Sequence, residues 1–133
     1  MTTTRRNNRL IFPAVVLVAG IGVAAGARAE GIRGLFCNTQ ADVGLALSLM
    51  EEGRTPGMAA ALVNVDAMRC SHADTIRYVV DQTVIVDGAG SGTIYRGQLT
   101  GVVAGGRVMP VTPPAQLYFV TPDARLIVGA REV

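Results

Sequence analysis

Few residues of this chain are of a type that could do chemistry. His72 is the only histidine among the 133 residues, and histidine is the usual general base near neutral pH. Ser71 and Asp74 lie beside it in the sequence, but a nucleophile–base–acid triad needs three side chains that converge in space. Sequence neighbours seldom converge in this way, so we interpret His72 as an isolated surface histidine. An enzyme with a site near His72 is kept as an alternative.

Two arginines form a second candidate site. Arg77 and Arg96 lie in segments that have the composition of neighbouring strands. If their guanidinium groups face each other, they could bind a carboxylate or a phosphate; two solvated side chains are the common alternative. The acidic residues are scattered, and no pair has the spacing of a glycosidase site. With one histidine and no Cys-x-x-Cys spacing, the sequence predicts neither a metal site nor a cofactor.

The glycine-rich stretch DGAGSGTIYRG begins at Asp87. A phosphate-binding loop of the P-loop type needs a lysine and a following helix, but this chain has no lysine and a strand-like segment follows. Glycines readily adopt positive φ, as tight hairpin loops require. We therefore predict that Gly88, Gly90 and Gly92 turn a β-hairpin.

Ser91, Gly92 and Tyr95 lie in the pentapeptide Ser-Gly-Thr-Ile-Tyr, which is similar to the Ser-Gly-x-x-Tyr motif of the periplasmic C-type lysozyme inhibitors. In that family a serine-bearing loop enters the lysozyme active site. The resemblance implies an inhibitor of a secreted lysozyme-type hydrolase, with the loop from Gly88 to Tyr95 as its partner-binding loop. It covers five residues, and the tryptophan-bearing second motif of the family has no counterpart in a chain without tryptophan.

The whole chain resembles uncharacterised small exported proteins of Gram-negative bacteria. In these, a Phe-Cys-x-Thr start leads into helices, a second cysteine and a β-rich half, as the stretch from Phe36 to Thr39 does here. This resemblance implies an exported protein and no particular activity.

Residues 1–29 have the three-part layout of a secretory signal peptide. Three arginines precede the apolar run of residues 10–26, and Ala27-Arg28-Ala29 has the small-x-small pattern of a cleavage site. Cleavage after Ala29 would leave one domain, residues 30–133, in the periplasm or secreted. A retained membrane anchor is the alternative, although Pro13 and three glycines weaken the apolar run as a membrane span.

Removal of the signal peptide changes the charge of the chain. The full sequence has a formal net charge of +2, but four of the twelve arginines precede residue 30, which leaves eight against ten acidic residues. A slightly acidic domain has no electrostatic footprint for nucleic acid and no basic patch for an anionic membrane surface. The expected partner is an unknown protein or a small ligand, with no stable membrane anchor after cleavage.

Two short helices are expected after a short exposed leader at residues 30–35. Thr39 and Thr55 are suitable N-caps, Pro56 suits a first helical position, and Gly53 suits a C-terminal position. Helical spacing predicts two apolar faces: Val43, Ala46, Leu47 and Met50 in the first helix; Met58, Ala61, Leu62 and Val65 in the second. Cys37 precedes the first helix and Cys70 follows the second, so a disulfide in an oxidising compartment would close the base of this helical hairpin. A pair of buried free thiols is the alternative.

From residue 75 onward the chain is rich in β-branched residues, which favour strands. We predict about five antiparallel strands, at residues 75–88, 92–106, 107–111, 115–123 and 125–130. Pro110 indicates an edge position. The expected fold is α+β, with two short N-terminal helices packed on an antiparallel β-meander and one disulfide. The expected function is that of a non-enzymatic binding or envelope-associated module.

Overall fold

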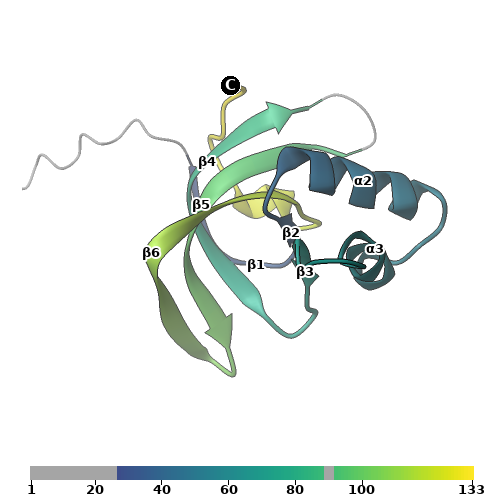
Figure 1. Ribbon diagram of the computed structural model, residues 1–133. Coiled ribbons are helices and arrows are strands. Elements are labelled where there is room, and N and C mark those ends of the chain that lie inside the picture. The colour runs from purple at the N-terminus through teal and green to yellow at the C-terminus, as the bar shows by residue number, and fades with distance from the viewer. Residues whose placement is uncertain (1–26, 89–91) are drawn as a thin grey trace, which may run out of the picture.

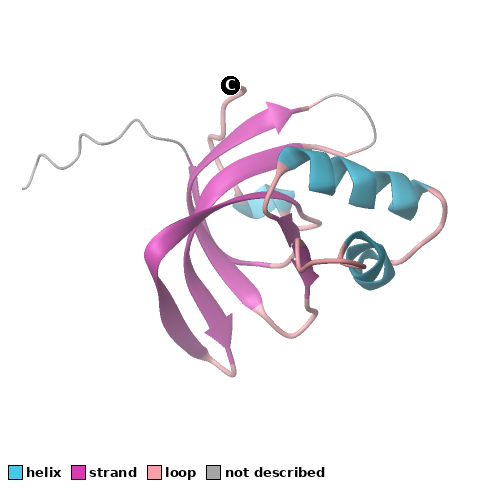
Figure 2. Ribbon diagram, viewed as in Figure 1, coloured by secondary structure: helices cyan, strands magenta, loops and turns pink. Residues whose placement is uncertain are grey.

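The computed structural model describes residues 27–88 and 92–133 of the chain, which form an α+β fold (Figures 1 and 2). Its elements are β1 (Ala27–Ile32), β2 (Leu35–Cys37), α2 (Gln40–Glu51), α3 (Pro56–Val63), β3 (Cys70–His72), β4 (Arg77–Asp87), β5 (Ile94–Ala104), β6 (Arg107–Val120) and the 3-10 helix η3 (Ala124–Leu126). The six strands form one curved antiparallel sheet in the order β1-β4-β5-β6-β2-β3.

The predicted fold class is correct, but two of its details are wrong. The helices lie between β2 and β3 rather than at the start of the fold, because the expected exposed leader belongs to strands β1 and β2. The described residues contain six strands, and the expected strand at residues 125–130 is instead part of η3 and the loop after it. The segments at residues 107–111 and 115–123 contribute to the single strand β6.

Strand β6 contains three prolines, which a regular central strand excludes. Gly101 pairs with Pro110 and Leu99 pairs with Ala115, so residues 111–114 bulge out opposite Thr100. The strand β2 pairs only with residues 118–120 of β6, so Pro110 lies where β6 is an edge. The prolines therefore occupy positions where the sheet does not need a backbone N–H to form a hydrogen bond between strands.

Strand β1 begins before the predicted cleavage position. Ala27 pairs with Thr83 and Ala29 with Val80 of β4, and both alanines are buried. The predicted signal peptide other than residues 27–29 lies outside the described residues. No helix among the described residues is long and apolar enough to cross a membrane.

The sheet separates two hydrophobic clusters because side chains alternate along its strands. Phe36 of β2 faces the concave cluster with Phe119, and their ring centroids lie 4.8 Å apart. Leu35 and Cys37, its neighbours in sequence, face the cluster beneath the helices. One strand therefore contributes to both cores.

Helix α2 forms as its sequence predicts. The Thr39 hydroxyl accepts a hydrogen bond of 3.1 Å from the Asp42 backbone N–H, and Gly53 adopts a φ of +102° just after the helix. Val43 and Ala46 are fully buried, and Leu47 and Met50 are partly buried on the same side.

Helix α3 has the predicted cap at Thr55, but its predicted apolar face is wrong. The buried residues are Ala59, Ala60 and Val63, whereas Met58, Leu62 and Val65 are exposed. Small side chains let a helix lie close to its neighbours, and α3 packs between α2 and the short strands β2 and β3. The alanine-bearing side therefore faces inward.

The predicted disulfide between Cys37 and Cys70 is confirmed. The two residues are direct partners in the β2–β3 pair, with a Cα–Cα distance of 4.0 Å. The open edge of β3 at Cys70 is covered by the Asn64 side chain. Its Oδ1 accepts from the Cys70 N–H at 2.8 Å, and its Nδ2 donates to the Cys70 carbonyl at 2.7 Å. The carboxamide thus bonds Cys70 as a neighbouring strand would, which protects this edge.

Candidate functional site: an apolar pocket beside His72

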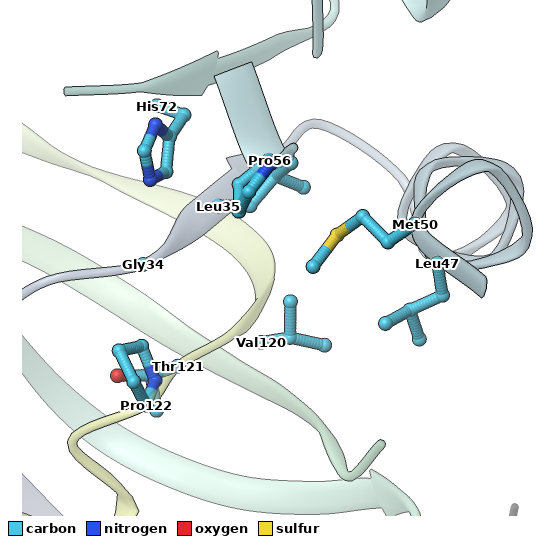
Figure 3. Close-up of a pocket in the computed structure, with 9 residues that line it drawn as sticks. All are labelled: Gly34, Leu35, Leu47, Met50, Pro56, His72, Val120, Thr121 and Pro122. Carbon is cyan, nitrogen blue, oxygen red and sulfur yellow. The ribbon is translucent and has the colours of Figure 1, made fainter. Parts of the chain in front are cut away.

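A pocket of about 300 Å³ opens between α2, the start of α3 and the sheet (Figure 3). Its lining comes from both short strands and both helices as well as from the end of β6: Gly34, Leu35, Leu47, Met50, Pro56, His72, Val120, Thr121 and Pro122. Most of these side chains are aliphatic. The pocket can therefore hold an apolar group, and few polar groups are available to orient it.

Strand pairing determines which side chains of the sheet line this pocket. Leu35 of β2 pairs directly with Val120 of β6, so both side chains point to the helix-covered side of the sheet. Leu47 and Met50 lie three residues apart on α2 and therefore share a face. In Figure 3 the Met50 thioether extends toward Val120, with Leu47 beside it.

Gly34 allows the chain to pass close to the end of β6. A side-chain carbon at this position would lie 2.5 Å from the Val120 carbonyl oxygen and 3.2 Å from the Phe36 ring. Because a backbone carbonyl cannot move aside as a side chain can, only glycine fits at this place in the pocket wall.

His72 is the one titratable side chain in the lining. Its side chain is 19% exposed, and its Nε2 lies 3.7 Å from a carboxylate oxygen of Asp74, which is almost fully exposed. Ser71 precedes His72 on β3, and successive strand side chains point to opposite faces. The structure therefore does not bring Ser71, His72 and Asp74 together as a triad. Across residues 27–88 and 92–133 no group of three or more His, Cys, Asp or Glu residues could hold a metal.

The structure does not bring Arg77 and Arg96 together either. Both are on adjacent strands, as predicted, but Arg77 pairs with Val103 and Arg96 pairs with Val84. Arg77 and Val84 are seven residues apart on β4, which is roughly 20 Å at strand spacing. The register therefore separates the two guanidinium groups, and they cannot share one anion.

The loop with the inhibitor-like motif is described only in part. Ser91 and Gly90 lie outside the described residues. Tyr95 is buried, and its ring stacks on Phe119 at a centroid distance of 5.3 Å. A side-chain carbon at Gly92 would lie 3.2 Å from Leu47 Cδ2, so this glycine permits close approach to α2. Neither Gly88 nor Gly92 has the positive φ expected of these glycines.

An ion pair between the half-exposed Arg33 and the buried Asp123 follows the pocket-lining residues Thr121 and Pro122. The Asp123 carboxylate is 4% exposed and accepts three hydrogen bonds from Arg33: from its backbone N–H at 2.8 Å, Nε at 3.1 Å and Nη2 at 2.9 Å. These bonds, first from the guanidinium and then from the backbone, lower the pKa of Asp123 to about 2. The pair connects the β1–β2 turn to the loop that carries Thr121 and Pro122.

Asp123→Asn should lower the free energy of unfolding at pH 7 by roughly 1–2 kcal/mol. This loss is smaller than the pKa shift alone would give, because water screens the charge of the half-exposed Arg33. The pKa of Asp123 is lower in the folded than in the unfolded chain, so its stabilisation is complete above about pH 4 and is lost as the pH falls toward 2. Urea unfolding at several pH values should therefore show the wild type approaching the variant in acid. Asp66→Asn removes the exposed pair with Arg69 and should change stability by less than about 1 kcal/mol. Equal losses of unfolding free energy in Asp66→Asn and Asp123→Asn would contradict a stabilising role of the Arg33–Asp123 pair.

The sequence predicted that Leu47 and Met50 share a helix face, but it indicated an isolated surface histidine at His72, which is instead 19% exposed and lines the pocket. The missing signal is the pairing of β2 with β6, which joins Leu35 to a residue 85 positions later in the chain. A comparison of the chain with protein-family models, with curated proteins and with solved structures found no match.

Proposed function

We propose that this chain is an exported binding protein without catalytic activity, and that its pocket beside His72 takes an apolar group of a small ligand. One observation carries the proposal: the pocket has about 300 Å³ of space, and its walls are aliphatic apart from His72 and Thr121. Ligand pockets of this kind are mostly apolar with a few polar groups. The volume is at the lower end of their range, so it suits a short alkyl chain or a single ring.

Two further features support a ligand held beside His72. The Thr121 hydroxyl already donates to the Arg33 carbonyl, which leaves the imidazole as the side chain most able to bond a polar end of the ligand. Export is supported by the predicted signal peptide and agrees with the disulfide, since disulfides persist in oxidising compartments. The disulfide lies beneath the helices that form one side of the pocket.

Filling the pocket should abolish binding of an apolar probe. We expect the wild-type protein to bind 1-anilinonaphthalene-8-sulfonate saturably and to show competition by octanoate. Met50→Trp would place an indole in the space that Met50 borders and should reduce dye binding at least tenfold. Leu45→Trp is the matched control, because Leu45 lies on the exposed side of the same helix and is 49% exposed.

The fold of each variant is checked by its urea unfolding midpoint. If Met50→Trp does not fold, Met50→Phe adds less volume and should still weaken binding. Saturable binding that both tryptophan variants retain would contradict the pocket as the site. The absence of saturable dye binding to the folded wild type would also contradict it.

A further inference from the structure

The tip of the β5–β6 hairpin exposes an apolar surface far from the pocket. Gly105 and Gly106 form the turn with φ values of +59° and +78°, and the residues that follow are Arg107, Val108, Met109 and Pro110. Val108 is 64% and Met109 is 51% exposed. Figure 1 shows this tip at the lower end of the sheet, away from α2 and the C-terminus.

Both faces of the tip are apolar. Val108 pairs with Val103, and Met109 pairs with Val102 across the hairpin, and both partners are only partly buried. Successive strand residues point to opposite faces, so Val108 and Met109 extend to the two sides of one narrow wedge. A flat protein surface could bury only one of the two apolar sides of such a wedge. A lipid phase would surround the wedge and bury both sides.

The charges around the tip have one sign. No acidic residue occurs between Asp87 and Asp123. Arg107 lies at the turn, and Arg77 lies two strands away on β4, where it pairs with Val103 near the tip. Both arginines are exposed, and within the described part of the chain neither makes an ion pair. The nearest acidic residue before Arg77 is Asp74, whose carboxylate faces His72.

We infer that this tip docks on an anionic phospholipid surface. Val108 and Met109 enter the boundary between headgroups and acyl chains, and Arg77 and Arg107 bond the lipid phosphates from the rim. The slightly acidic net charge of residues 30–133 does not oppose this, because the acidic residues lie outside the hairpin. Peripheral docking of this kind is independent of the pocket and of any segment before residue 27.

The chain lacks tryptophan, so a single introduced indole reports on its own position. In the protein isolated as the cell exports it, Val108→Trp should show a blue shift of its emission on addition of phosphatidylglycerol/phosphatidylethanolamine vesicles. Vesicles of phosphatidylcholine alone should give a smaller shift at the same lipid concentration. Leu45→Trp, on α2, should show no shift with either vesicle.

Vesicle flotation gives the energetic test. The double variant Val108→Ser/Met109→Ser should bind phosphatidylglycerol-containing vesicles at least tenfold more weakly, and Arg107→Gln about fivefold more weakly. Met58→Ser/Leu62→Ser is the matched control, because Met58 and Leu62 are 53% and 41% exposed on α3; it should bind within twofold of the wild type. An unshifted emission at position 108, equal binding to neutral vesicles, or an equal loss in the α3 control would overturn the inference.

Discussion

Phe119→Ala should lower the free energy of unfolding by about 3–5 kcal/mol, the range for truncation of a buried aromatic residue. Phe119 is fully buried, and its ring lies 4.8 Å from that of Phe36 and 5.3 Å from that of Tyr95. These contacts connect β6 to β2 on one side and to β5 on the other. The variant would leave a cavity where three strands meet, which urea unfolding would detect.

Two other substitutions make this test specific. Phe119→Leu keeps most of the apolar volume and should cost clearly less than the alanine variant. Gln116→Ala changes an exposed residue of the same strand and should stay within about 0.5 kcal/mol of the wild type. A loss below about 1 kcal/mol for Phe119→Ala would show that these rings do not form the core.

The same ring stack explains why the lysozyme-inhibitor motif is difficult to interpret from sequence. A Ser-Gly-x-x-Tyr pentapeptide suggests two side chains presented to a partner. In this fold Tyr95 is the second residue of β5 and points into the concave core, so it supports the sheet. Alternation along a strand decides which face a residue occupies, and the pentapeptide alone does not contain that information.

Features set by near neighbours in the chain could be predicted. Thr39 and Thr55 cap their helices, and Gly53 ends the first one. The long hairpin strands at β4 and β5 were also predicted. Each of these depends on a few adjacent residues, whose propensities act locally.

Features set by distant pairing could not be predicted. The segment before Cys37 has no strong strand pattern, yet β2 inserts between β6 and β3 and divides its side chains between two cores. The pocket depends on that insertion. The buried face of α3 was missed because tight packing against α2 favours Ala59 and Ala60 over the larger Met58 and Leu62.

Charge distribution was a further nonlocal property. The net charge of residues 30–133 does not indicate where the exposed arginines lie, since it averages over acidic residues in other elements. Only the register places Arg77 beside the hairpin tip and far from Arg96. The two arginines that the sequence offered as a candidate anion site therefore belong to different parts of the sheet.

Removal of the disulfide between Cys37 and Cys70 should lower the free energy of unfolding by about 3–4 kcal/mol. The bond joins residues 33 positions apart and closes a loop that contains both α2 and α3. Both cysteines are buried beneath these helices with Val43 and Ala59, so the bond holds the helical hairpin against the sheet. The double variant Cys37→Ala/Cys70→Ala, measured by urea unfolding, should show this loss.

Because Leu47, Met50 and Pro56 belong to the closed loop and line the pocket, we expect the double variant to lose dye binding at lower urea concentration than the wild type. Reductant is the internal control: it should destabilise the wild type by a similar amount and leave the double variant unchanged. Thiol titration of the purified, unreduced protein should find no free cysteine. Two titratable thiols in that protein, or a double variant within about 1 kcal/mol of the wild type, would show that the loop is held closed by packing alone.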